Sequence, residues 1–336
     1  MKRKNLNAAK LKDAVLKDKK ISKIYSKLNL TTKNTKSFLA AISGGSDSMA
    51  LALLSKLLRE EKNKRVYFVH VDHAIRKNSS KEALQLKNIL KKYQIHLKII
   101  KNKKTIQKNI QKNARDTRYQ ILCDFCKKNN IKSLVTAHHK DDQIETFLIR
   151  LSRGSGVQGL SSMSTISLID NQVKIFRPFL SLNKKELIFT SKKIFNNFIK
   201  DPSNINKKYL RSNIRKLLPI LSRHGIKEDQ ILKSINNLKS SNQTINIYFK
   251  EVFKKTVKRK GKKILINKKN LFSLNDDLQI RILGFVIKSL NKLDYPPRSK
   301  KLINALNFLK PDKEIKYQLA GCLLLSSNKQ IFVEKS

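Results

Sequence analysis

The segment Ser43-Gly44-Gly45-Ser46-Asp47-Ser48 carries the strongest chemical signal in this sequence. Two adjacent glycines allow a sharp turn and a close approach to a ligand, and a helix that starts here offers free N–H groups to phosphate. The serine hydroxyls add donors, and a carboxylate beside a phosphate can help to hold Mg²⁺. The Gly-Lys-Ser/Thr ending of a Walker loop is missing. An ordinary helix N-cap is the alternative, but the strand-loop-helix setting favours phosphate binding.

Acidic and histidine side chains follow two other apolar runs. Asp72 ends the second run, and its carboxylate could hold a metal or a ribose hydroxyl; a turn cap is the alternative. His138 and Asp142 are four residues apart and so share one helix face, where they could bind metal or position a proton-transfer group. Asp141 and Glu145 share the adjacent face. Surface polar residues would be the alternative for an isolated pair of this kind.

Four arginines could contact anionic groups. Arg115 and Arg118 lie in a basic helical stretch, where either could neutralise phosphate charge as it develops. Arg211 and Arg215 are four residues apart, so we expect them to project together. A solvated basic face is the alternative for both pairs.

Two other motifs resemble sites but lack the required context. The glycines from Gly154 to Gly159 fit G-x-G-x-x-G, but they follow a helix pattern instead of a strand, so we interpret them as a flexible loop near the site. Cys123 and Cys126 form a C-x-x-C inside a helical stretch. We interpret them as buried structural thiols and keep a redox or cluster role as the alternative.

The elements that must position these residues alternate along the chain. Strand patterns alternate with helical patterns, and this order predicts an α/β fold with a Rossmann-like, doubly wound parallel sheet. Ligands gather at the carboxyl ends of such strands, where three of the motifs lie. The predicted strands are 38–42, 66–71, 95–100 and 134–137, and the predicted helices are 49–61, 80–93, 107–130 and 138–150.

After Pro219 the alternation of strand and helix patterns gives way to mainly helical patterns. Helical patterns at 226–253, 278–290 and 300–309, with a closing hairpin at 317–333, predict a smaller, mainly helical domain. We therefore expect a basic N-terminal lead-in over 1–35, a sheet domain over 36–222 and a C-terminal domain over 223–336. We interpret the cluster of charged residues from 254 to 263 as a solvated turn or an RNA-facing edge.

Composition limits the class of protein. The 336 residues hold 74 Lys and Arg against 24 Asp and Glu, a net charge of +50, which predicts a nucleic-acid partner. A genome rich in A and T is the alternative origin of this charge. Three cysteines exclude a disulfide scaffold, and no stretch approaches the roughly 20 apolar residues of a membrane span. We expect a soluble cytoplasmic protein with no membrane partner.

The phosphate-loop segment resembles that of the N-type ATP pyrophosphatases, and further segments extend the likeness. Together and in this order they resemble the tRNA(Ile)-lysidine synthase family, from about residue 36 to 221 and more weakly over 275–336. The segments are 43–48, 69–76, 113–119, 136–146, 150–160, 177–180, Asp201-Pro202-Ser203-Asn204 and 209–215.

This resemblance implies a reaction and a set of site residues. ATP would adenylate the C2 oxygen of the wobble cytidine in tRNA(Ile) with a CAU anticodon, and L-lysine would then displace AMP to form lysidine. The tRNA would change from methionine to isoleucine identity and from AUG to AUA decoding, and the C-terminal domain would bind it. The implied ATP-binding residues are Ser43, Gly44, Gly45, Ser46, Asp47, Ser48 and Asp72. The implied catalytic residues are Asp47, Arg115, His138 and Asp142, with Asp47 and Asp142 also at Mg²⁺. The implied substrate-binding residues are Arg118, Asp141, Arg211 and Arg215.

Two rival interpretations remain. A tRNA thiolase of the same superfamily would use Cys123 and Cys126, which it would need at the active site. A non-enzymatic RNA-binding protein with a degenerate nucleotide fold would not need the intact loop at 43–48.

Overall fold

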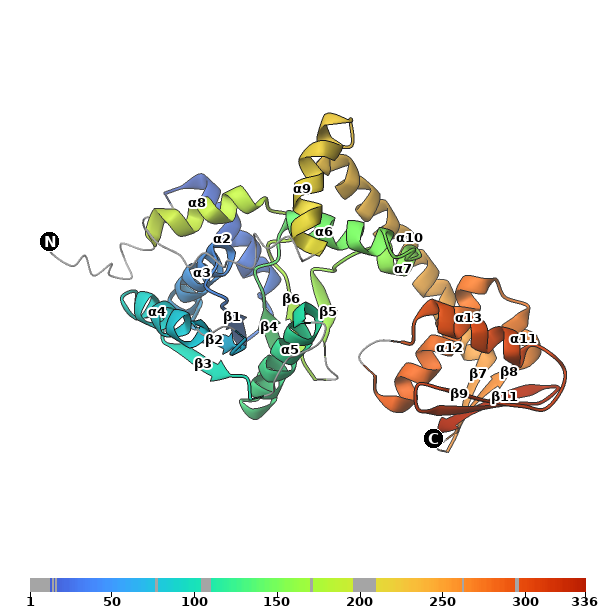
Figure 1. Ribbon diagram of the computed structural model, residues 1–336. Coiled ribbons are helices and arrows are strands. Elements are labelled where there is room, and N and C mark those ends of the chain that lie inside the picture. Colours follow the sequence, from blue (N-terminus) through green and yellow to red (C-terminus); the bar gives the residue numbers. More distant parts are fainter. Residues whose placement is uncertain are drawn as a thin grey trace, which may run out of the picture. The chain divides into compact units, whose positions relative to one another are not determined.

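The computed structural model describes residues 13, 15, 17–75, 78–103, 110–169, 172–195, 210–261, 263–293 and 296–336. The chain forms two compact units, residues 1–236 and 237–336 (Figure 1). The division falls inside one long helix, α10 (Glu228–Thr256), and each unit has its own hydrophobic core. In the described part of the chain, no helix combines the length and apolar character needed to cross a membrane.

The first unit is built on a six-stranded sheet with the strand order β3-β2-β1-β4-β6-β5. The pairs among β1, β2, β3, β4 and β6 are parallel, and β5 runs antiparallel at the edge. This arrangement confirms the predicted doubly wound sheet, to which the structure adds β5 and β6. The strands are β1 (Ser37–Ala41), β2 (Arg65–Asp72), β3 (Leu97–Lys101), β4 (Ser133–Val135), β5 (Ile166–Leu168) and β6 (Lys174–Phe176).

Strand β1 is buried on both faces of this sheet. Phe38 and Ala40 pack into the core on one face, whereas Leu39 packs into the core on the other. A strand covered on both sides needs apolar residues at every position, which explains its continuous apolar run. The helices of this unit are α2 (Lys19–Thr31), α3 (Ser46–Lys62), α4 (Ser79–Lys91), α5 (Ile110–Lys128), α6 (Lys140–Leu151), α7 (Val157–Leu160), α8 (Lys184–Ile194) and α9 (Leu210–Arg223).

The helices divide between the two faces. Helices α2, α3, α4 and α8 supply side chains to the first core, and α5 supplies Leu122, Cys123 and Cys126 to the second. Helix α2 lies within the N-terminal segment that the sequence analysis set apart, and its buried Ile21, Ile24 and Leu28 belong to the first core. The β1–α3 and β2–α4 connections therefore cross on one face and the β3–α5–β4 connection on the other. All four strands present their carboxyl ends at one edge.

The second unit contains a five-stranded antiparallel sheet with the order β7-β8-β11-β10-β9. The expected closing hairpin is present as β10 and β11, but it belongs to a larger sheet. The charge run at 254–263, interpreted as a turn or edge, contains the end of α10 and edge strand β7. The elements are β7 (Val257–Lys260), β8 (Lys263–Asn267), α11 (Lys268–Phe272), α12 (Asp276–Asn291), α13 (Ser299–Leu309), β9 (Ile315–Leu319), β10 (Cys322–Ser326) and β11 (Gln330–Lys335).

Candidate active site

The loop between β1 and α3 is held in shape by the hydroxyl group of Ser48. Its oxygen accepts hydrogen bonds from the backbone N–H groups of Ser43 at 3.1 Å and Gly44 at 3.0 Å. The same hydroxyl donates to the carbonyl oxygen of Gly45 at 2.9 Å. Gly44 has φ 93°, a left-handed conformation that suits glycine. Ser48 therefore shapes the loop from inside and is not a free donor for a ligand.

The start of α3 is the part of this loop that suits an anion. Gly45 occupies the N-cap position, and no side chain hydrogen-bonds to cap the helix. This observation removes the simple N-cap interpretation of the segment, because no serine or aspartate side chain caps the first turn. The N–H groups that begin a helix lack partners within it, and they carry the positive end of its dipole. They are thus available to a phosphate.

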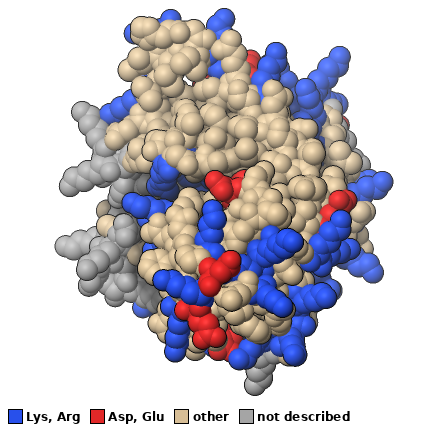
Figure 2. Space-filling model, turned by 90° about the vertical axis from the view of Figure 1, so that its right-hand side faces the viewer, with Lys and Arg blue, Asp and Glu red and all other residues tan. Residues whose placement is uncertain are grey.

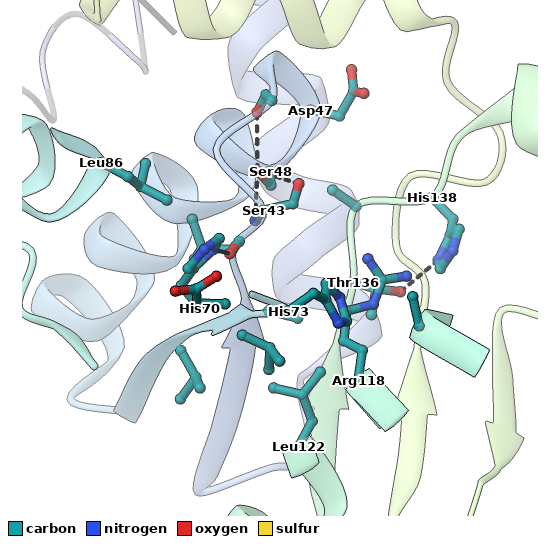
Figure 3. Close-up of a pocket in the computed structure, with 18 of the residues that line it drawn as sticks. Ser43, Asp47, Ser48, His70, His73, Leu86, Arg118, Leu122, Thr136 and His138 are labelled. Carbon is teal, nitrogen blue, oxygen red and sulfur yellow. Dashed lines mark hydrogen bonds between the residues drawn. The ribbon is translucent and has the colours of Figure 1, made fainter. Parts of the chain in front are cut away.

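The loop opens into a cavity of about 510 Å³ at the carboxyl ends of β1, β2 and β4 (Figure 3). The structure thereby brings together most of the site residues expected from the sequence. Those lining the cavity are Ser43, Gly45, Asp47, Ser48, Asp72, Arg118, His138, Asp142, Arg211 and Arg215. Gly44, Ser46, Arg115 and Asp141 do not line it. The segment Asp201-Pro202-Ser203-Asn204 lies outside the described residues.

His139 lies at the centre of a carboxylate cluster that the sequence analysis did not assign to the site. Its buried Nε2 is 3.5 Å from Oδ2 of Asp47 and 3.5 Å from Oδ2 of Asp142. Its Nδ1 is 3.5 Å from Oδ1 of Asp141. Burial acts to lower the pKa of His139, but the surrounding carboxylates outweigh it and raise this pKa to about 10. His139 is therefore a buried imidazolium that links the phosphate loop to the start of α6.

The same carboxylates fit a Mg²⁺ ion that arrives with a nucleotide. Asp47 and Asp142 each place one oxygen beside the same nitrogen of His139, so two carboxylates converge next to the phosphate loop. Among the described residues, no group of three or more His, Cys, Asp or Glu side chains could hold a metal ion alone. Mg²⁺ in nucleotide sites commonly takes one or two carboxylates and completes its shell with phosphates and water. The residues present match that pattern.

His138 is a neutral imidazole that lines the cavity. Its Nδ1 lies 2.7 Å from Oγ1 of Thr136, which fixes the ring (Figure 3). Burial, together with neighbouring guanidinium groups including Arg115 and Arg118, lowers the pKa of His138 to about 3 against the opposing charge of Asp142. His138 can thus exchange hydrogen bonds with a substrate without carrying charge. Although Arg115 does not line the cavity, its positive charge contributes to the lowered pKa of His138.

At the end of β2, Asp72 takes the turn-capping role that the sequence analysis kept as an alternative, and it also lines the cavity. The Asp72 carboxylate accepts hydrogen bonds from the backbone N–H of Ala74 at 2.9 Å and the hydroxyl of Ser80 at 2.7 Å. Burial acts to raise its pKa, but these hydrogen bonds outweigh burial and lower it. Asp72 therefore organises the turn. His73 lines the cavity, and its buried Nδ1 has no hydrogen-bond partner among the described residues.

Helix α9 brings two arginines to the cavity in different ways. Arg215 donates from Nε to Oε1 of Glu145 at 2.5 Å and from Nη2 to Oε2 at 3.4 Å. Glu145 is 1% exposed and lies on α6, so this pair ties α9 to α6. Arg211, one turn earlier, also lines the cavity. Burial lowers the pKa of Arg118, which reaches the cavity from α5.

The sequence analysis also missed the lining residues Lys184 and Tyr119. Lys184 stands at the start of α8. Burial acts to raise the pKa of Asp141, but His139 outweighs it and lowers this pKa, with a smaller contribution from the charge of Lys184. The buried hydroxyl of Tyr119 has no hydrogen-bond partner in the described structure. Lys184 is one lysine among many in this chain, so its type and position alone carry no signal. Tyr119 lies in the segment 113–119 that the family resemblance includes.

The glycine segment 154–159 and the cysteine pair Cys123 and Cys126 both have structural roles. The carbonyl oxygen of Gly159 accepts a hydrogen bond from Nη1 of Arg150 at 2.6 Å, so part of the glycine segment is anchored as helix α7 and does not line the cavity. Cys123 and Cys126 are buried in the core under α5 and do not line the cavity. Burial raises the pKa of Cys126 to about 12. These thiols therefore lack the exposure that thiolase chemistry would need.

Sequence comparison identifies relatives over most of the chain. The family model described as the PP-loop domain matches residues 15–221. A tRNA(Ile)-lysidine synthase from Wolbachia pipientis wMel is 34% identical over 298 residues, which cover 87% of this chain and 69% of that protein. A tRNA(Ile)-lysidine synthase from Orientia tsutsugamushi (strain Boryong) is 38% identical over 179 residues, covering 53% of this chain and 40% of that protein.

Structural comparison supports the fold. The U34-tRNA thiolase NcsA from Methanococcus maripaludis, solved with its [4Fe-4S] cluster, aligns with a TM-score of 0.54 at 18% identity. The alignment covers 66% of this chain and 79% of that one. At this level of identity, the likeness concerns the arrangement of strands and helices.

Proposed function

The chain belongs to the tRNA(Ile)-lysidine synthase family of PP-loop enzymes and is an ATP-dependent ligase, and from this premise we propose its reaction. It joins L-lysine to C2 of the wobble cytidine in tRNA(Ile) with a CAU anticodon. ATP is consumed to AMP and pyrophosphate. The product, lysidine, pairs with A, so the tRNA reads AUA and is charged with isoleucine. Because the proposed substrate is a tRNA, we propose that the reaction takes place in the cytoplasm.

One observation carries this proposal: a single cavity joins the phosphate loop to carboxylates, a neutral histidine and arginines. The free N–H groups at the start of α3 would bind phosphate at one end of the cavity. Arg118 and Arg211 line the same cavity from other helices and would compensate negative charge. Mg²⁺, held by Asp47 and Asp142 when bound, would neutralise charge on the phosphates and on the leaving pyrophosphate.

In the first step, the C2 oxygen of cytidine attacks the α-phosphorus of ATP and pyrophosphate leaves. The loop N–H groups and the arginines would stabilise the charge that moves onto the pyrophosphate. His139 would hold Asp47 and Asp142 in place, since its imidazolium lies within 3.5 Å of both carboxylates. His73 would contribute a hydrogen bond through its unpartnered Nδ1.

In the second step, the ε-amine of lysine attacks C2, the bond from C2 to the adenylated oxygen breaks, and AMP leaves. The amine must lose a proton before or during attack. Neutral His138 and the Asp142 carboxylate both line the cavity and are the candidate proton acceptors. Either group could accept the proton while the other orients the amine through a hydrogen bond.

Charge supports an RNA substrate. In Figure 2, Lys and Arg side chains gather in the lower part and along the rim of the face in view, where they are more widespread than Asp and Glu. Phosphate contacts of this kind position an RNA without reading its sequence. We propose residues 36–222 as the catalytic domain and 223–336 as a tRNA-binding domain.

A mass-spectrometric assay tests the proposal. The protein is incubated with ATP, Mg²⁺, L-lysine and a tRNA(Ile) transcript bearing CAU, and the RNA is digested to nucleosides. We expect an ATP-dependent lysine adduct on cytidine that is lost in Asp47→Ala and retained in Asp124→Ala, whose carboxylate is exposed on α5 away from the cavity. Adenylated RNA without a lysine adduct would refute L-lysine as the nucleophile of the second step. Unmodified RNA would refute the proposed reaction as a whole.

A further inference from the structure

The sheet of the second unit has one face covered by helices and one face that no described element covers. Alternate residues along its strands, among them Leu324, Ile331 and Val333, are buried in the core with side chains from α12 and α13 (Figure 1). Because side chains alternate across a strand, the intervening residues point to the other side. We call that second surface the outer face.

A single cross-strand row runs across the middle of the outer face. The register pairs Lys258 with Leu265, Leu265 with Phe332, Phe332 with Leu325, and Leu325 with Lys316. The three central side chains are partly exposed and the two lysines are exposed, one on each edge strand. At a strand spacing of about 4.8 Å, the row spans about 19 Å. An aromatic ring flanked by aliphatic groups thus has a cation at each end.

The charges around this row are mainly positive. Lys263 and Lys260 are paired neighbours on β8 and β7, next to the row. Glu334 is the only acidic residue in the five strands, and it is neutralised by an ion pair with Lys263 at 2.8 Å. A second copy of this chain would present the same positive charge, so self-association through the outer face is disfavoured.

We propose that the outer face binds a short single-stranded segment of RNA, with a base stacked on Phe332 and phosphates on Lys258 and Lys316. Unpaired RNA combines flat apolar faces with regularly spaced negative charge, and this row offers the complement of both. Open sheets in RNA-binding modules use aromatic residues to stack two or three bases, which suits the length of the row. The inference rests on the proposed function for the identity of the RNA, because it names a contact for the same tRNA outside the cavity.

The test separates stacking from bulk hydrophobicity. Binding of the full-length protein to a nine-nucleotide oligouridine RNA and to the tRNA transcript is measured by fluorescence anisotropy at fixed salt. Phe332→Leu should weaken binding of both by about tenfold, since stacking of a base on an aromatic ring contributes about 1–3 kcal/mol. Phe332→Trp should retain the affinity because it preserves an aromatic surface. Equal affinity for Phe332→Leu and the wild type, with unchanged melting, would overturn the proposal.

The lysines provide a second readout. Lys258→Gln and Lys316→Gln should each reduce the slope of log affinity against log salt by about 0.7, whereas Lys301→Gln on the exposed side of α13 should not. Crosslinking of 4-thiouridine RNA should map to the peptide that contains Phe332. Crosslinks confined to other peptides, or a change of oligomeric state in Phe332→Leu, would assign the face to a different partner. Because these measurements need no lysidine formation, their outcome is independent of the proposed reaction.

Discussion

Replacing Arg215 with methionine should destabilise the first unit more than replacing its partner Glu145 with glutamine. Glu145 is 1% exposed, so loss of the guanidinium leaves a carboxylate that water cannot reach. Arg215 is 32% exposed, so in the converse variant the remaining charge can be partly hydrated. Stranding a buried charge costs about 3–5 kcal/mol. We expect about 3 kcal/mol for Arg215→Met, because the pair is not completely enclosed, and about 1 kcal/mol for Glu145→Gln, which keeps an oxygen acceptor.

Urea unfolding followed by circular dichroism measures these differences. The double variant Arg215→Met, Glu145→Leu is the control, and it should recover most of the lost stability because an apolar pair replaces the ions. Equal losses in the two single variants would refute the assignment of Glu145 as the stranded charge. Activity should fall in both single variants, since the pair holds the helix that carries Arg211 to the cavity.

Four further predictions concern the cavity and its surroundings. Stability should fall as pH rises from about 6.5 to about 10, because the pKa of His139 is raised by its carboxylates, and His139→Gln should flatten this part of the unfolding profile. Gly44→Ala, at φ 93°, should lower ATP affinity at least tenfold in a binding titration while the circular dichroism spectrum is kept; unchanged affinity would contradict the strained-loop argument. Lys184→Met should raise the inhibition constant of pyrophosphate several-fold, whereas the control Lys185→Met, at an exposed position, should leave it unchanged. A raised KM for L-lysine in Lys184→Met would instead indicate that Lys184 contacts L-lysine. Cys126→Ser should retain lysidine formation in the nucleoside assay, and loss of activity in a folded variant would revive the thiolase interpretation.

Patterns local to the chain were sufficient to predict the centre of the first sheet. The apolar run at β1 and the segment after it identify a doubly buried strand and a phosphate loop, because both signals lie within a few consecutive residues. Strands β5 and β6 have three residues each and no readable period, so they were missed. Strands β7 and β8 were missed because lysines at the ends of both obscure the alternation.

Relations between distant residues explain the remaining differences at the site. The four-residue spacing of Arg211 and Arg215 suggests one shared role, yet Arg215 is bound to Glu145, 70 residues away in the sequence. His139 directly follows His138, but the backbone between them turns from strand end to helix start, so one ring is neutral and the other is charged. Asp72 has the position of a ligand-binding carboxylate, and only the nearby hydroxyl of Ser80 reveals its use in the turn. The spacing of residues in the sequence does not predict any of these interactions.

The hydrogen bonds of Ser48 have a consequence for the speed of nucleotide capture. A loop already closed around an internal hydroxyl needs no rearrangement before phosphate arrives, so its ordering entropy is paid during folding. Encounter should then be governed by diffusion and by the field of the surrounding cations, instead of by a closing motion. The association rate of ATP should consequently be single-phase and fall with ionic strength, and Ser48→Ala should introduce a slow, salt-independent phase.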